Sequence, residues 1–77
     1  MTEFRRRFGS CDCRIEVQRV GVAVYTARFF TVDKDQATPI LDASGQPVVL
    51  TSTTPAWVYL KAVRFLTERF GPDIQDA

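Results

Sequence analysis

The chain contains no histidine, and this absence excludes the most familiar hydrolytic and metal-binding arrangements. The common nucleophilic triads need a histidine as general base. Structural zinc sites usually combine four cysteine or histidine ligands, whereas this chain has only two cysteines. The paired carboxylates Asp33/Asp35 and Asp73/Asp76 fall in turn-like or tail segments, where we expect solvation rather than a desolvated catalytic pocket. The four glycines are scattered and form no phosphate-cradling loop, so we expect neither enzymatic activity nor a cofactor.

Long hydrophobic runs and a strong net charge are also lacking. No segment approaches the ~18 apolar residues of a transmembrane helix, and no apolar segment follows the basic N-terminus as in a secretory signal. Two cysteines without an export signal favour a reducing compartment, so we expect a cytoplasmic protein with no membrane partner. The net charge of +1 argues against a dedicated polyanion binder. Its distribution is uneven, because residues 1–30 hold six arginines against three acids.

Apolar side chains are abundant for so short a chain. Seventy-seven residues form one domain, 1–77, near the lower limit for unaided folding. Yet 45% of the residues are hydrophobic and nine are aromatic. We therefore expect either a dense core or apolar surface that is buried between chains.

The segment from Thr54 to Pro72 predicts a helix with both ends specified. Thr54 is a suitable N-cap, and Pro55 suits the first helical position, where its missing N–H costs nothing. Gly71 suits the left-handed position after the helix, and Pro72 prevents its continuation. The sequence therefore places an α-helix at about residues 55–70.

The preceding residues predict strands and turns. Alternation over 13–20 indicates a half-buried strand, and 22–32 reads as a second strand that follows a break at Gly21. After a polar turn, 38–41 and 46–51 are predicted to form a hairpin around an Asp42–Gly45 turn. Phe4 and Phe8 could share a face in either a helical turn or a strand, so that segment stays open. We interpret 1–10 as a basic N-terminal segment that can be mobile, and 72–77 as a frayed tail.

These elements predict an α+β domain, in which a small antiparallel meander of three or four strands packs against one C-terminal α-helix. The face of the second strand that carries Ala23, Tyr25, Ala27 and Phe29 is free of charge, so we assign it to the core. We expect the helix to bury the stripe Ala56, Tyr59, Leu60, Val63, Leu66 and Phe70. The expected core comprises Ile15, Val17, Tyr25, Phe29, Leu50, Leu60, Val63, Leu66 and Phe70.

Two apolar surfaces then remain without cover. One is the other face of the second strand, with Val22, Val24, Phe30 and Val32; the other is a helix ridge of Val58, Ala62 and Phe65, next to Trp57. Contiguous apolar patches usually mark interfaces, and two-fold homodimers are the commonest soluble assembly. We therefore interpret the chain as a self-associating interaction module that forms a homodimer or binds another protein. Its candidate interface residues are Val24, Phe30, Val58, Ala62 and Phe65. The alternative is that another segment of the same chain covers one of these surfaces.

Cys11 and Cys13 are two residues apart and lie on one side of an extended backbone. One chain cannot supply four zinc ligands, but two chains could combine Cys11 and Cys13 in an intersubunit site. Oxidation of the pair is a further alternative, although the spacing lacks the helix-start context of redox sites. The plainest interpretation is one buried, inert thiol and one thiol in a loop, with no metal bound.

Nucleic-acid binding is the main alternative function. An order of three strands and one helix is similar to that in double-stranded RNA-binding domains and in the arm-binding domains of phage-type integrases, which implies nucleic-acid contact. The residues that would make phosphate or groove contacts are Arg5, Arg6, Arg7 and Arg28, with Phe4 and Phe8 as stacking groups. An antitoxin-like or regulatory module that docks on another protein would instead use the apolar surfaces described above.

Overall fold

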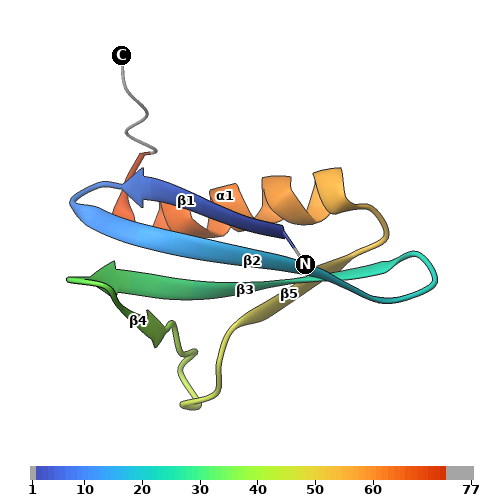
Figure 1. Cartoon of the computed structure of the whole chain (residues 1–77), viewed down its shortest axis with the longest axis horizontal. Helices are drawn as coiled ribbons and strands as arrows, with labels where there is room; N and C mark the ends of the chain where they lie inside the picture. Colours follow the sequence, from blue (N-terminus) through green and yellow to red (C-terminus); the bar gives the residue numbers. More distant parts are fainter. Residues whose placement is uncertain (1, 73–77) are drawn as a thin grey trace.

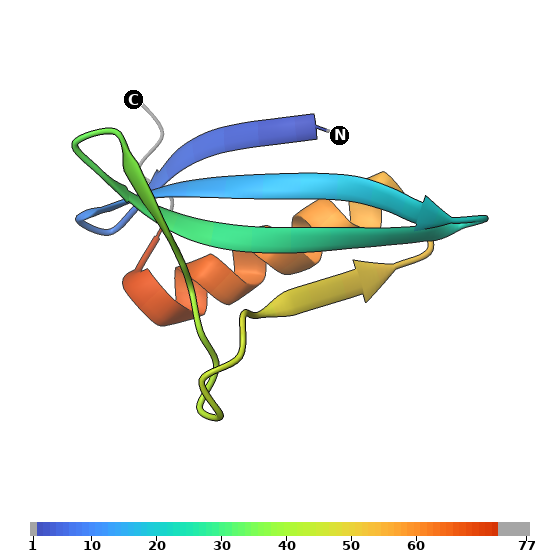
Figure 2. The same cartoon turned by 60° about the horizontal axis from the view of Figure 1, so that its bottom comes forward.

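A computed structural model describes residues 2–72 and shows an antiparallel sheet with a single helix on one face (Figures 1 and 2). The strand order is β1-β2-β3-β4, and β5 pairs with β3 as well. This arrangement confirms the predicted α+β class, and within residues 2–72 no helix is long and apolar enough to cross a membrane. The elements are β1 (Thr2–Phe8), β2 (Cys11–Gly21), β3 (Val24–Asp33), β4 (Gln36–Pro39), β5 (Val49–Ser52) and α1 (Pro55–Phe70).

The strands β4 and β5 follow one another along the same edge of β3. β4 pairs with the end of β3 from Phe30 to Asp33, and β5 pairs with its beginning from Tyr25 to Arg28. Between them, residues 41–47 loop away from the sheet, whereas Ile40 is buried and its N–H donates to the Phe29 carbonyl oxygen at 2.9 Å (Figure 2). The predicted 38–51 hairpin is therefore reduced to one bridge, Leu41 with Pro47, because both of its arms find a longer partner in β3.

The turn at the tip of this loop forms as predicted. Asp42 Oδ1 accepts hydrogen bonds from the backbone N–H of Ser44 at 2.8 Å and of Gln46 at 3.1 Å. The Ser44 hydroxyl hydrogen bond, followed by the Gln46 N–H, lowers the pKa of the Asp42 carboxyl. Gly45 takes a φ of +84°, which is the left-handed conformation expected for it.

The N-terminal segment is an edge strand, which decides between the helical turn and the strand left open by the sequence. β1 pairs along its whole length with β2. Phe4 and Phe8 point to the helix side: the Phe4 ring lies 4.7 Å from that of Tyr59, and Phe8 is fully buried. The Arg6 guanidinium lies over the Tyr59 ring at 5.5 Å. Residues 73–77 of the predicted tail lie outside the described residues.

The two ends of α1 use the predicted caps. The Trp57 N–H donates to Thr54 Oγ1 at 3.1 Å, and Pro55 occupies the first turn. At the other end, the Gly71 N–H donates to the Thr67 carbonyl oxygen at 3.0 Å. Because these caps depend on residues adjacent in sequence, the helix ends could be read without knowing the sheet.

The C-terminus of α1 meets the β1–β2 turn through backbone atoms. The Gly9 N–H donates to the Pro72 carbonyl oxygen at 3.0 Å. Gly9 has a φ of +60°, and a Cβ there would lie 2.1 Å from the Phe70 carbonyl oxygen. No residue other than glycine fits this contact without displacement of the helix end.

The helix face that packs on the sheet is rotated from the predicted one. Val58, Ala62 and Leu66 are fully buried along the line of closest contact, whereas Leu60 is 55% exposed and Ala56 is exposed. Tyr59, Val63 and Phe70 flank this line on one side and Phe65 on the other, all of them half-buried. The predicted burial of Leu60 is therefore wrong. The sheet covers both flanks of the line through Val58, Ala62 and Leu66, and Leu60 lies on the opposite side of the helix from this line.

The predicted sheet core is largely confirmed. Ile15, Val17, Ala27 and Phe29 are buried beneath α1, as the alternation of β2 and β3 indicated. The remaining expected core residues of the sheet, Tyr25 and Leu50, are half-buried and pack against this cluster.

The contact at Gly9 predicts a specific loss of stability. Gly9→Ala should lower the free energy of unfolding by about 3 kcal/mol, because the new methyl group meets the Phe70 carbonyl in addition to the strain of a positive φ. Gly45→Ala is the matched control: it has the same backbone strain and nothing within 4 Å, so a loss of about 1 kcal/mol is expected. Urea denaturation measures both values. Equal losses for the two variants would contradict a steric role for the Gly9 contact.

Two leucines of α1 test the rotated face. Leu66→Ala should cost ~2–5 kcal/mol, because its side chain is fully buried. Leu60→Ala, on the same helix but 55% exposed, should cost less than ~1 kcal/mol. Thermal unfolding followed by circular dichroism distinguishes them, and a larger effect at Leu60 would restore the face expected from the sequence.

Candidate interaction surfaces

The sheet face opposite α1, here called the outer face, is covered by no element of the described chain (Figures 1 and 2). Directly opposed residues of antiparallel strands share a face, so the register fixes its composition. One row across the sheet is Arg5, Arg14, Phe30 and Pro39. The next row is Glu3, Glu16, Arg28 and Val49, so both rows begin with charged residues on β1 and β2 and end with an apolar residue on β4 or β5.

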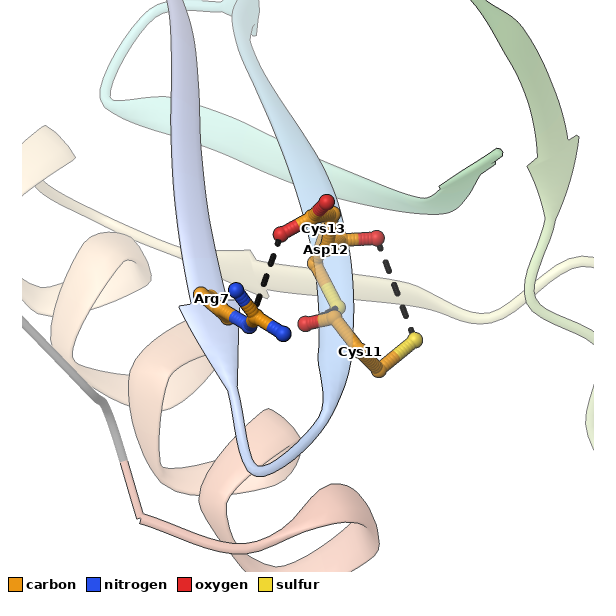
Figure 3. A network of polar contacts seen from close by, with 4 residues as sticks. All are labelled: Arg7, Cys11, Asp12 and Cys13. Carbon is orange, nitrogen blue, oxygen red and sulfur yellow. Dashed lines mark hydrogen bonds and ion pairs between the residues drawn. The ribbon is translucent and has the colours of Figure 1, made fainter. Parts of the chain in front are cut away.

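The β1–β2 part, here called the charged half, balances its charges. Arg14 donates to the Glu16 carboxylate, and Arg7 lies 3.9 Å from Asp12. Figure 3 shows Arg7 and Asp12 facing each other across the two strands. The members are three arginines and three acids, which sum to zero: Glu3, Arg5, Arg7, Asp12, Arg14 and Glu16.

A hollow of about 330 Å³ opens at this end of the sheet. Its lining contains Arg5, Arg7 and Asp12 from the charged half, with Val32 beside them. Arg7 and Asp12 are both largely exposed, so their ion pair is screened by water and their charges offset each other. Arg6 and Cys13 also line the hollow, and the Arg7–Asp12 pair supplies no desolvated charge of the kind that anchors a small ligand.

The arginines predicted to bind nucleic acid are split between two faces. Arg6 points to the helix side, whereas Arg5, Arg7 and Arg28 lie on the outer face. On that face Arg28 stands directly opposite Glu16. Acidic residues thus interrupt the arginines, and the outer face carries no continuous basic strip. The three-strand order behind the resemblance to RNA-binding and integrase modules also differs from the five strands that precede α1.

The β3–β5 part of the outer face, here called the apolar half, carries several hydrophobic side chains, with Thr26 and Arg28 between Val24 and Phe30 along β3. Phe30 lies opposite Pro39, and the Arg14 guanidinium stacks over the Phe30 ring at 4.7 Å. Val24 is 41% exposed and Val49 43% exposed. The members of the apolar half are Val24, Phe30, Val32, Pro39 and Val49.

The five predicted interface residues therefore separate into two groups. Val24 and Phe30 lie on the open outer face, as predicted. Val58 and Ala62 are fully buried beneath α1, and Phe65 packs on Phe29 with ring centroids 4.9 Å apart. The helix ridge is thus part of the core, and the expectation that it remains uncovered is wrong.

The sequence analysis placed Val22 on an uncovered strand face, whereas the structure places it in the turn between β2 and β3. The turn lies at Val22 and Ala23, between the paired Gly21 and Val24, and Val22 is 86% exposed. Ala23 takes a φ of +53°, which a non-glycine residue rarely adopts. Since this turn contains no polar turn residue, only the break at Gly21 signalled it. On α1, Trp57 and Leu60 point to solvent as an exposed apolar pair.

The two cysteines occupy different environments at the start of β2 (Figure 3). Cys13 is buried, and desolvation by burial, followed by the charge of Cys11, raises its pKa from 9.0 to about 12. Cys11 is half-buried. Because the Cys13 side chain is enclosed within its own chain, it is not presented to a second subunit as an intersubunit metal site requires. No cluster of three or more potential metal ligands occurs within residues 2–72.

The burial of Cys13 predicts a difference in thiol reactivity. At pH 8 a thiol with a pKa of about 12 is ionised in roughly one molecule in ten thousand, so Cys13 should react slowly with a disulfide reagent. One thiol per chain, Cys11, should react first in the native protein, and two should react in denaturant. Cys11→Ser is the control that should remove the fast reaction. Two equally fast thiols in the native protein would show that Cys13 is accessible.

Comparisons with known proteins gave no match for this chain among protein-family models, curated proteins or solved structures.

Proposed function

We propose that this chain is a non-enzymatic interaction module that self-associates through the apolar half of its outer face. The observation that supports the proposal is the uncovered apolar strip of Phe30, Val32 and Pro39, with the exposed Val49 opposite the neighbouring Arg28 and the exposed Val24 further along β3. Apolar patches of this kind in small proteins usually become buried by a partner. Burial of a side chain of this size from water stabilises a complex by roughly 1.5–3 kcal/mol.

The charges bordering the strip favour a second copy over a polyanion. In a two-fold contact the same surface meets itself, so a border that mixes both signs can be complementary to its own copy. The charged half has this mixed character, with three positive and three negative residues. A nucleic-acid strand crossing the same face would meet Glu3, Asp12 and Glu16 as well as the arginines. Nothing in the described structure favours the nucleic-acid alternative over self-association.

The proposal predicts that a charge at the centre of the strip disrupts the assembly. Phe30→Glu should halve the solution mass measured by size-exclusion chromatography with light scattering, because the contact would bury an unpaired carboxylate. Gln18→Glu, an exposed change on the outer face of β2 outside the strip, is the matched control and should leave the mass unchanged.

Salt separates the two candidate partners in the same experiment. An apolar contact should persist or strengthen as salt is raised, whereas binding to nucleic acid should weaken steeply. A parent protein and a Phe30→Glu variant of equal mass would exclude the apolar half as the interface.

A further inference from the structure

The strand β1 has one backbone edge that no other strand occupies within residues 2–72. It stands at the end of the strand order and pairs only with β2. An edge of this kind is a template for pairing with another chain. Its side chains decide which chain can pair with it, since directly opposed side chains interact most strongly.

We propose that β1 pairs antiparallel with β1 of a second copy about a two-fold axis at Phe4. In this register Glu3 lies opposite Arg5 of the partner copy, and Arg5 lies opposite the partner copy's Glu3. Phe4 lies opposite the same residue of the partner copy. The joined strand pair would extend two five-stranded sheets into one.

Both faces of the joined strands are complementary in this register. Glu3 and Arg5 lie on the outer face, where each would form an ion pair across the axis. Phe4 lies on the helix side, where its ring already packs 4.7 Å from that of Tyr59. The two Phe4 rings would therefore join the aromatic contacts beneath the two helices.

Several other registers that keep both helices on the same side of the sheet oppose like charges. An axis at Arg5 places Arg5 against itself, and an axis at Glu3 places Glu3 against itself. Axes at Arg6 and Arg7 bring arginine against arginine. Like charges directly opposite each other are destabilising. Axes at Thr2 and Phe8 avoid this repulsion but pair just one residue of β1 with its copy, so the axis at Phe4 is the one that pairs several residues of β1 without repulsion. A shift by one residue would place the apolar Phe4 beside an outer-face arginine, contrary to the layering of the sheet.

This contact is separate from the one proposed for the apolar half. β1 lies at the opposite edge of the sheet from β4 and β5, so both contacts can form in one assembly. The two-fold axis of the edge contact is perpendicular to the sheet, whereas that of a face contact lies parallel to it. Two perpendicular axes are the symmetry of a tetramer.

The test is made in a chain that carries Phe30→Glu, so that its result does not depend on the apolar half. We expect this chain to retain a mass of twice 8.7 kDa by light scattering at about 100 µM, far above the micromolar dissociation constants of weak complexes. Adding Glu3→Arg should reduce the mass to 8.7 kDa, because arginine would then oppose Arg5 of the partner copy. Adding both Glu3→Arg and Arg5→Glu should restore the double mass, since the exchanged charges are again complementary. Val49→Glu replaces Phe30→Glu if circular dichroism shows that the latter is unfolded.

Arg7→Glu is the matched control. It changes the charge by the same amount as Glu3→Arg, with the opposite sign, on the same strand and face. Arg7 lies beyond the paired residues 2–6, so the mass should be unchanged. A chain that is monomeric with either Phe30→Glu or Val49→Glu would overturn the edge contact while leaving the apolar-half contact intact. Restoration by Glu3→Arg with Arg7→Glu, but not with Arg5→Glu, would instead place the axis at Arg5 and overturn the proposed register.

Discussion

The backbone contact between Gly9 and the end of α1 is the constraint on which the rest of the structure depends. The hydrogen bond from the Gly9 N–H to the Pro72 carbonyl oxygen ties the β1–β2 turn to the helix C-terminus. The two backbones approach so closely that a Cβ on Gly71 would lie 3.4 Å from the Gly9 Cα. Because this turn is tied to the helix, the arginine-rich N-terminal segment lies beside β2 as the strand β1. β1 then forms one edge of the sheet.

The added width of the sheet explains the orientation of α1. Ala62 lies at the centre of the buried line, where a small side chain allows the helix to approach the strands closely. Tyr59 then reaches Phe4 on β1, and Phe65 reaches Phe29 on β3. A narrower sheet without β1 would leave Tyr59 without its partner. Both flanks of the helix, with Tyr59 on one side and Phe65 on the other, are therefore packed against the sheet of the same chain. Exposed apolar side chains remain on the outer face, at the β2–β3 turn and at the Trp57–Leu60 pair.

Local chemistry could be read from the sequence, whereas the placement of elements against one another could not. The Thr54 and Gly71 caps and the Asp42 turn depend on neighbouring residues, and they form as predicted. The alternation of β2 and β3 correctly assigned Ile15 and Phe29 to the core. The helix rotation depends on β1, whose pairing with β2 no local pattern shows. The two arms of the predicted hairpin, β4 and β5, likewise pair with the edge of β3 and not with each other. This edge is distant in sequence and takes the backbone hydrogen-bonding groups that the hairpin would have used.

The same long-range effects divided the candidate site. Val24 and Phe30 stayed on an open face because strand alternation alone determines their side of the sheet. Val58 and Ala62 were misassigned because a helix has several apolar stripes, and only the shape of the sheet selects among them. The arginines were grouped by sequence as a basic run, but a strand sends neighbouring residues to opposite faces. Arg6 thus entered the helix side, leaving Arg5 and Arg7 among acids.

The placement of the β1 arginines on two faces of the sheet also suggests a role for them other than nucleic-acid binding. A free strand edge invites indiscriminate pairing, and charged side chains along it are a common protection. The three consecutive arginines meet an arginine of the other copy when the axis lies at Arg5, Arg6 or Arg7, so they protect the edge against those registers. Glu3 removes the repulsion in one register only, the one that also brings the two Phe4 rings together. The composition of β1 thus opposes like charges for axes at Glu3, Arg5, Arg6 and Arg7 but not at Phe4, which is the pattern expected of a strand that recognises its own copy.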